Sequence, residues 1–442
     1  MTASVADKNI NHQTGFPKVE NRKYDVIIVG AGIVGLSTAY HIKNESQNLS
    51  VLVVEKAPSY AQGNTGKSAA GFRDMFSSEV NFKLSSSTVN FYKHVQQNLG
   101  YDIGMNFVGY LFLMSDQQIR SGVVEEFKKR TRVRVLERDE LSRIPNINLN
   151  PDKDAKQLMD LADIDAGLLG LNCGIIEPDL IAKFYFEESK KMGVEFAFNT
   201  TVEKVNLAPV NPLNFPGEPF NWQKKQIASL DTTRGSLYAD TYILATDAWT
   251  TGLLDPLGVD SHIRPKKRQI FSLSGREIED TVMHSGINQD GILPFTILPS
   301  HGVYIRPAPK ERSMWIGLAD DIGRDFSFTE DPQPEPDFYN YSMAQVLSAY
   351  FPSTARAKVA SSWAGYYSYS TTDMNPFIFK ELNMVISTGT SGSGILKGDA
   401  IGRYTAAVYF GHSNAKLYGG QEASTSLLGV NERSVERERF IL

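Results

Sequence analysis

A glycine-rich turn near the start of the chain has the residue types and spacing of a phosphate-binding motif. The motif is G-x-G-x-x-G and consists of Gly30, Ala31, Gly32, Ile33, Val34 and Gly35. Its first glycine would permit a tight turn, its second would let backbone N–H groups approach a pyrophosphate, and its third would let a helix pack closely on a sheet. Glu55, with Lys56 beside it, follows at the distance expected of a residue that accepts hydrogen bonds from ribose hydroxyls. The pattern predicts a dinucleotide site.

The segments around this motif complete a βαβ unit. Residues 24–29 (YDVIIV) and 51–55 (VLVVE) are apolar, β-branched runs typical of buried parallel strands, and residues 33–42 between them have helical spacing. Two further strands of the same kind are predicted at residues 238–246 and 384–388. These segments predict one parallel sheet that is assembled from distant parts of the chain.

A second set of segments is short, apolar or alternating, and rich in aromatic residues. These segments are residues 109–115, 301–305 and 313–318, and they indicate antiparallel strands. The expected fold class is therefore mixed α/β (α+β). It has a Rossmann-like domain with a discontinuous parallel sheet and a second domain with a mainly antiparallel sheet.

Composition argues against several other classes of protein. The formal net charge of −5 offers no positive surface for nucleic acid or an anionic membrane. Cys173 is the sole cysteine, so an intrachain disulfide is impossible and a reducing, cytoplasmic setting is expected. The seven histidines show no ligand spacing, so we expect no metal. No apolar run approaches the ~20 residues of a membrane-spanning helix, and residues 1–21 are expected to form a flexible leader.

Two short motifs fail on their spacing. Gly66-Lys67-Ser68 is similar to the end of an ATP-binding P-loop, but that loop needs a glycine where this chain has Ala61. Residues 389–394 (GTSGSG) do not satisfy G-x-S-x-G. ATPase and hydrolase activities are therefore not expected.

A collinear series of blocks resembles the D-amino acid oxidase and sarcosine oxidase family, close to the branch of sarcosine oxidase β-subunits and proline dehydrogenases. The blocks are residues 68–76 (SAAGFRDMF), 109–111 (GYL), 174–178 (GIIEP), 201–205 (TVEKV), 245–249 (ATDAW), 363–367 (WAGYY) and 389–394. The resemblance covers residues from about 24 to 410 and implies a bound FAD. Relatives that tether the flavin use a cysteine or histidine, but Cys173 lies elsewhere and residues 63–73 hold no histidine, so the FAD is expected to be non-covalent.

The resemblance also implies a division of the chain. The FAD-binding domain is expected to comprise residues 22–100, 166–262 and 363–415, the substrate domain residues 101–165 and 263–362, and a C-terminal tail residues 416–442. The further residues implied at the cofactor are Ser68, Ala69, Ala70, Val202, Thr246, Asp247, Trp249, Gly392, Gly394, Ile395 and Leu396. Asp247 stands where the family usually has glycine, and aspartate tolerates left-handed backbone angles better than most residues.

The family reaction transfers hydride from the substrate carbon to flavin N5 while the amine becomes an imine, which water hydrolyses. The expected substrate is a small amino acid or N-alkyl amino acid, such as sarcosine, proline or glycine. Arg73, at the place of the sarcosine oxidase substrate arginine, would bind the carboxylate, unless it serves an ion pair or contacts FAD. Arg306, within a strand predicted at residues 303–307, is a second candidate if it does not face outward. Tyr367 and its neighbour Tyr366 would line the pocket or pack in the core.

Two positions depart from the sarcosine oxidase pattern. The family lysine that helps hold the carboxylate falls on Leu396, and Lys397, displaced from it by one residue, is the remaining candidate substrate residue. The oxygen-activating lysine of monomeric sarcosine oxidases matches Trp315. These departures favour a dehydrogenase over an oxidase.

Other readings of the same fold stay open. The chain could oxidise a 2-hydroxy acid or glycerol 3-phosphate, in which case a histidine base near the flavin is expected. It could also be a non-catalytic flavoprotein, as one subunit of a complex or as an assembly factor. For a dehydrogenase, the electron acceptor would be a quinone or a protein partner, while an oxidase would use oxygen, and an oligomer or heteromeric complex is compatible with either.

Overall fold

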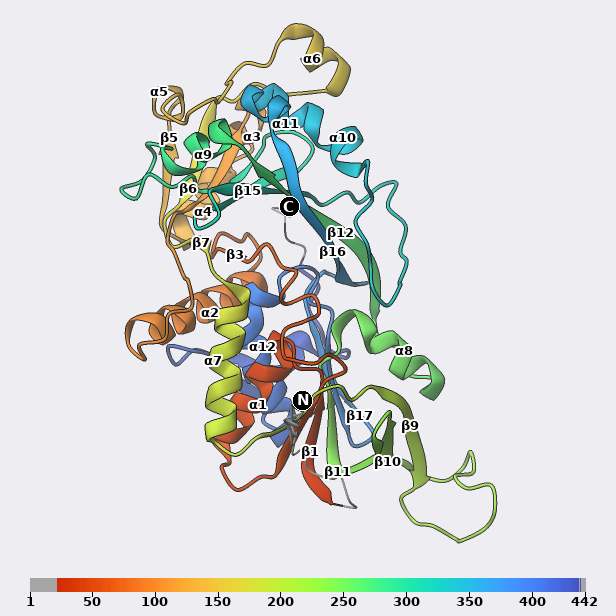
Figure 1. Cartoon of the computed structure of the whole chain (residues 1–442). Helices are drawn as coiled ribbons and strands as arrows, with labels where there is room; N and C mark the ends of the chain where they lie inside the picture. Colours follow the sequence, from red (N-terminus) through yellow and green to blue (C-terminus); the bar gives the residue numbers. More distant parts are fainter. Residues whose placement is uncertain (1–21, 437, 439–442) are drawn as a thin grey trace, which may run out of the picture.

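The computed structural model describes residues 22–436 and residue 438 (Figure 1), so the expected leader lies outside the described residues. A first sheet has the strand order β17-β18-β11-β1-β2-β8, and the hairpin β9–β10 extends it from β11. Its strands are β1 (Lys23–Val29), β2 (Val51–Val54), β8 (Glu195–Ala197), β9 (Val202–Pro209), β10 (Lys225–Thr232), β11 (Gly235–Leu244), β17 (Phe377–Glu381) and β18 (Met384–Thr388). The strands from β18 to β8 pair in parallel, as predicted.

Helices cover one face of this sheet (Figure 1). They are α1 (Ile33–Glu45), α2 (Glu79–Gln97), α7 (Pro178–Lys191) and α12 (Gly394–Phe410). Helix α1 packs against α7 and α12, and α2 packs against α12. Apolar residues of the strands and helices, such as Ile28, Leu36 and Ile401, are almost fully buried between them. This packing fixes the start of α1 at the carboxyl ends of the parallel strands, where a ligand is expected to bind.

The second sheet lies in the upper half of Figure 1, above the first sheet and its helices. Its strand order is β16-β12-β15-β14-β13-β4-β6-β5. Its strands are β4 (Tyr110–Met114), β5 (Val133–Leu136), β6 (Ala166–Gly170), β12 (Ile263–Ser274), β13 (Phe295–Ile297), β14 (Val303–Ala308), β15 (Ser313–Leu318) and β16 (Lys358–Ser370). All neighbours pair antiparallel except β13 with β4. The predicted mixed fold class is therefore confirmed.

The remaining α-helices and strands are short. They are α3 (Asp116–Arg120), α4 (Val123–Arg130), α5 (Arg138–Leu141), α6 (Lys153–Met159), α8 (Thr250–Leu254), α9 (Arg276–Met283), α10 (Phe338–Ser342), α11 (Ala344–Tyr350), β3 (Gly71–Phe72), β7 (Gly174–Ile175), β19 (Asn414–Lys416) and β20 (Glu422–Ser424). Strands β3 and β7 pair with each other between the two large sheets.

Two segments next to the expected domain boundaries at residues 166 and 363 pair within the second sheet. They are β6 and residues 363–370 of β16. β16 is one long strand paired with β12 along its whole length. It therefore carries the second sheet toward the first.

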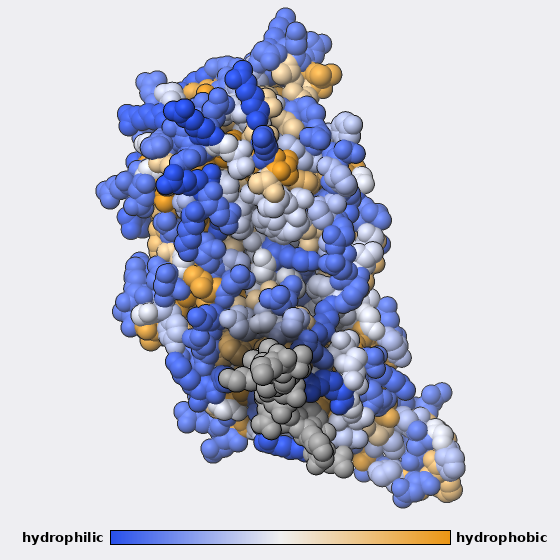
Figure 2. All heavy atoms as spheres, viewed as in Figure 1, coloured by the Kyte–Doolittle hydropathy of each residue, from blue (hydrophilic) through white to orange (hydrophobic). Residues whose placement is uncertain are grey.

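The face shown in Figure 2 is mostly hydrophilic, with hydrophobic residues scattered among the polar ones. Within residues 22–436, no helix is long and apolar enough to cross a membrane.

Candidate functional site

A cavity of about 840 Å³ is lined by elements of both large sheets and by the start of α12. Most residues predicted at the cofactor line it, namely Gly30, Gly32, Ile33, Val34, Glu55, Lys56, Ser68, Ala69, Ala70, Val202, Thr246, Asp247, Trp249, Gly392, Gly394, Ile395 and Leu396. Ala31 and Gly35 belong to the same turn but do not line the cavity. The structure thus brings together residues that lie up to 366 positions apart in the sequence.

Two positions of the glycine turn at the start of α1, Gly30 and Gly35, leave no room for a side chain. Gly30 has φ +104°, and a Cβ there would lie 2.6 Å from the carbonyl oxygen of Ala245. A Cβ on Gly35 would lie 1.9 Å from the carbonyl oxygen of Gly30. The Glu55 carboxylate accepts the N–H of Ala31 at 2.8 Å, so it supports the turn in addition to facing the cavity. This narrow, backbone-lined cradle fits the pyrophosphate of FAD.

Residues 61–70 connect this cradle to the second sheet. The N–H of Ala61 donates to the carbonyl of Ala31 at 2.9 Å. Farther along, the Asn64 side-chain oxygen accepts the N–H of Tyr366 at 2.9 Å, and the carbonyl of Lys67 accepts the indole N–H of Trp363 at 2.9 Å. The segment is therefore fixed by the glycine turn on one side and by β16 on the other.

Asp247, the departure from the family glycine, joins three segments at the cavity wall. Its φ is +45°, in the left-handed region. Its Oδ1 accepts hydrogen bonds from the Ser368 hydroxyl of β16 and from the Thr390 hydroxyl at 3.1 Å, and its Oδ2 lies 3.5 Å from the Asn64 amide. Burial raises the pKa of Asp247. These hydrogen bonds hold the Asp247 side chain against the cavity wall, so it does not project into the space for the cofactor.

Three of the four predicted substrate residues line the cavity together: Arg73, Tyr367 and Lys397. The guanidinium of Arg73 is buried and lies 4.5 Å above the Phe76 ring. Lys397 is also buried, and its Nζ donates to Oδ1 of Asn81. Burial, which disfavours the charged ammonium, lowers the pKa of Lys397 to about 7.

Tyr367 packs against the turn that begins α12. Its ring would lie 2.5 Å from a Cβ on Gly392, which has φ +84°. Only glycine allows this close approach of ring and backbone. The contact sets the position of the Tyr367 ring at the cavity wall.

Arg306, the fourth candidate substrate residue, lies outside the cavity lining. Its side chain is 2% exposed, and Nε donates to the carbonyl of Ala69 at 3.1 Å. Nη2 forms an ion pair with Glu177 at 3.4 Å, and the guanidinium lies 4.2 Å from the Trp315 ring centre. β14 is covered on both faces, so Arg306 points inward and holds Ala69 in place through this hydrogen bond.

Several cavity-lining residues were missed by the sequence analysis. They include Asn64, Thr65, Lys67, Asn81, Tyr110, Arg268, Tyr304, Glu330, Tyr369 and Glu438. The glycines around Asn64 and Lys67 signalled a turn, although it is not a P-loop. Arg268 and the tyrosines lie on strands whose facing cannot be read from a strand pattern alone. Nothing in the sequence signals that Glu438 returns to the cavity.

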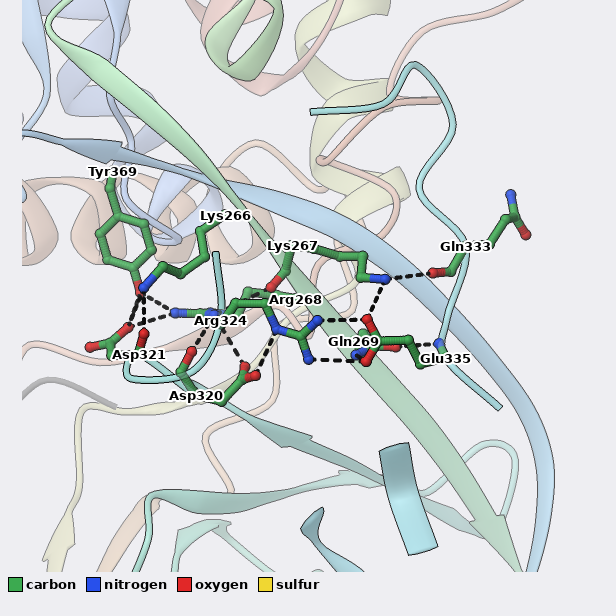
Figure 3. Close-up of polar contacts among 10 residues, drawn as sticks. All are labelled: Lys266, Lys267, Arg268, Gln269, Asp320, Asp321, Arg324, Gln333, Glu335 and Tyr369. Atoms are coloured by element: carbon green, nitrogen blue, oxygen red, sulfur yellow. Dashed lines mark hydrogen bonds and ion pairs between the residues drawn. The ribbon is translucent and has the colours of Figure 1, made fainter. Parts of the chain in front are cut away.

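Residues 319–336 connect β15 to α10 and lie against β12 through the charged residues shown in Figure 3 (hereafter the 319–336 loop). Arg268 forms ion pairs with Asp320 at 3.2 Å and Asp321 at 2.7 Å. The Arg268 side chain is 8% exposed and also donates to the Tyr369 hydroxyl. These contacts hold the first part of the loop against the cavity-lining side of β12.

The last part of the loop is held by Glu335 (Figure 3). Arg324 donates to both carboxylate oxygens, at 2.6 and 3.1 Å, and Lys267 of β12 forms an ion pair at 2.6 Å. The backbone N–H of Glu335 donates to the Gln269 side chain at 2.5 Å. Hydrogen bonding to Arg324 lowers the pKa of Glu335 to about 2.

The middle of the loop reaches the cofactor residues. Glu330 forms an ion pair with Lys56 and accepts the indole N–H of Trp249 at 2.9 Å. The N–H of Thr329 donates to the Tyr366 hydroxyl at 2.7 Å. The loop therefore lies over the cavity between Lys56, which follows β2 of the first sheet, and Tyr366 of β16 in the second.

Comparison with known proteins supports the assignment of the cavity as an FAD site. The family model described as DAO, FAD dependent oxidoreductase, matches residues 25–408. FAD-dependent oxidoreductase domain-containing protein 1 of Xenopus laevis is 26% identical over 423 residues, covering 86% of this chain and 78% of that protein. Sarcosine oxidase subunit beta of Rhodobacter capsulatus is 24% identical over 246 residues, 53% of each chain.

Among solved structures, L-proline dehydrogenase from P. horikoshii is similar with a TM-score of 0.69 at 20% identity, covering 88% of this chain and 94% of that one. The resemblance seen in the sequence is confirmed, and FAD is the cofactor. The chain belongs to the DAO family of FAD-dependent oxidoreductases.

Proposed function

We propose that the protein oxidises the C–N bond of an amino acid or N-alkyl amino acid to an imine, which water then hydrolyses. The observation that carries this proposal is that Arg73 and Lys397 line the same cavity as the FAD-binding turns. Two cationic side chains in one buried compartment suit a carboxylate, and a planar guanidinium can bind it through two parallel hydrogen bonds.

FAD, when bound, would supply the acceptor for the hydride. The residues proposed to hold it are those of the glycine turn, Glu55, Lys56, residues 68–70, Val202, residues 246–249 and residues 392–396. Among the described residues that line the cavity there is neither cysteine nor histidine, which supports non-covalent binding. Cys173 is buried beside Asp74, 3.7 Å from its carboxylate, and is not in the lining.

The protein's own side chains would bind and orient the substrate and keep water away from it. Arg73 would hold the carboxylate, and Lys397 would add a second hydrogen bond while it carries a proton. Tyr367 and Tyr110 would form apolar walls that place the α-carbon. Because the pKa of Lys397 is about 7, the carboxylate is expected to bind more weakly as the pH rises above neutrality.

We propose a dehydrogenase in preference to an oxidase. Trp315, at the position of the oxygen-activating lysine, stands edge-on to Trp363 at 4.9 Å, and Trp363 lines the cavity. An aromatic pair would replace the cation that promotes reaction with oxygen. A quinone or a protein would then accept the electrons.

The test is anaerobic titration of the holoprotein with amino acids, N-methyl amino acids, proline and 2-hydroxy acids. The flavin absorbance is recorded during each titration. We expect one amine class to bleach the flavin, and slow reoxidation when air is admitted. Bleaching only by 2-hydroxy acids or glycerol 3-phosphate would replace the proposal with the alcohol reaction, and no bleaching would indicate a non-catalytic flavoprotein. Reoxidation within seconds would overturn the dehydrogenase assignment alone.

A further inference from the structure

The segment after β20 returns to the cavity and is anchored by a buried ion pair. Arg433 donates to both carboxylate oxygens of Asp373, at 2.9 and 2.6 Å, and the two side chains are only 3% and 2% exposed. The guanidinium also donates to the carbonyls of Asn375 and Pro376 at 2.9 Å. Because the charges of this buried pair are matched and its donors are hydrogen-bonded, the pair holds the segment in one place.

Beyond this anchor, two carboxylates of the segment bind the start of α2. Glu436 accepts the N–H of Glu79 at 2.8 Å. Glu438 accepts the N–H groups of Ser77 at 2.9 Å and Ser78 at 3.0 Å. Carboxylates are stabilised at a helix N-terminus by its free N–H groups and by the helix dipole. The two residues differ in one respect, because Glu438 lines the cavity and Glu436 does not.

A chain of hydrogen bonds connects Glu438 to Lys397. Glu438 binds the N–H of Ser78, and the Ser78 hydroxyl accepts the side-chain amide of Asn81 at 2.7 Å. That bond turns Oδ1 of Asn81 toward Lys397, whose Nζ donates to it. Ser78, Asn81 and Lys397 are all buried, so the chain is shielded from solvent.

We propose that Glu438 is a positioning residue for the substrate carboxylate. It orients Asn81 through Ser78 and keeps Lys397 cationic beside Arg73. The proposal rests on the proposed function, in which Lys397 and Arg73 bind that carboxylate. A segment about 40 residues past Lys397 would thereby complete the substrate compartment.

The charges around Lys397 act on its pKa in opposite directions. Burial and the Arg73 charge lower the pKa of Lys397, whereas Glu438 and Asp373 raise it. Asp373 is already neutralised by Arg433, so Glu438 is the carboxylate whose removal should matter most. Without it, Lys397 would lose its proton at a lower pH and bind a carboxylate less well near neutrality.

The experiment uses acetate, which cannot be oxidised here and stays anionic between about pH 6 and pH 9. Its dissociation constant is measured on the holoprotein from the change in flavin absorbance. For the wild type we expect binding to weaken above the Lys397 pKa of about 7. In Glu438→Gln that weakening should begin at lower pH, with affinity at neutral pH reduced on the order of tenfold, the factor equivalent to one pKa unit.

Glu436→Gln is the matched control, since it removes a carboxylate from the same segment and the same helix end but not from the cavity. It should leave the acetate profile unchanged, and Glu438→Asp should restore part of the loss. Identical profiles for wild type and Glu438→Gln, an equal shift in Glu436→Gln, or no acetate binding by the wild type would each overturn the inference. If no amine reduces the flavin but the acetate profiles shift as described, the proposed function fails and the role of Glu438 stands.

Discussion

Asp247 gives the sharpest prediction because its cost and its benefit both follow from the structure. Replacing it with glycine relieves the left-handed backbone at φ +45°, which is worth about 1 kcal/mol. The same change removes three hydrogen bonds to Oδ1, from the Ser368 hydroxyl and from the N–H and hydroxyl of Thr390. Each such bond contributes about 0.5–1.5 kcal/mol, so the net loss of stability should be about 0.5–3.5 kcal/mol.

Asp247→Ala separates the two effects. Alanine loses the same hydrogen bonds but keeps the backbone strain, so it should be about 1 kcal/mol less stable than Asp247→Gly. Urea unfolding of the holoprotein measures both variants, and fluorescence of released FAD measures the cofactor affinity, which should fall because Asp247 and Thr390 line the cavity. An Asp247→Gly variant as stable as the wild type, or less stable than Asp247→Ala, would refute this reasoning.

Three further predictions follow from individual contacts. Gly35→Ala should yield protein without FAD, measured as the flavin-to-protein ratio, because the new Cβ would collide with the Gly30 carbonyl at 1.9 Å; a fully loaded variant would contradict this. Arg306→Met should lower the free energy of unfolding by about 3 kcal/mol, because it leaves buried acceptors without a hydrogen-bond donor. Arg73→Met should instead mainly weaken acetate binding. The reverse pattern would indicate that Arg306 is a substrate residue. Glu335→Gln should lower the melting temperature at neutral pH but not near pH 2. Because the pKa of Glu335 is lowered from 4.5 to about 2 in the folded protein, its charged carboxylate stabilises the fold fully above pH 4.5, and this stabilisation is lost as the pH falls toward about 2. A difference in melting temperature between the two proteins that stays constant at all pH values would contradict this role of Glu335.

Local sequence patterns were sufficient to predict the glycine turn and four strands of the first sheet, β1, β2, β11 and β18, but not its other strands. The run at residues 24–29 is apolar throughout because β1 lies between two parallel strands, and Gly30 and Gly35 are required by contacts within one βαβ unit. Arg73 and Lys397 were found through family resemblance, and the structure places both in the cavity lining.

Features that depend on contacts between distant segments could not be predicted from local patterns. Arg306 lies on a strand whose facing cannot be read from the sequence, and its role in the scaffold is indicated only by its hydrogen bond to Ala69, 237 positions away. The contacts of Asp247 with Ser368 span 121 positions, and those of Glu438 with Ser77 span 361. No periodicity in the sequence encodes such pairings.

The most direct test of the central claim compares matched substrates in one assay. Holoprotein is mixed anaerobically with alanine or lactate, and with proline or N-methylglycine, and the rate of flavin reduction is recorded for wild type and Arg73→Met. The account predicts that at least one amine reduces the flavin about 100-fold faster than the hydroxy acid, with weaker binding in Arg73→Met. Faster reduction by the hydroxy acid, or amine reduction with unchanged affinity in Arg73→Met, would contradict it.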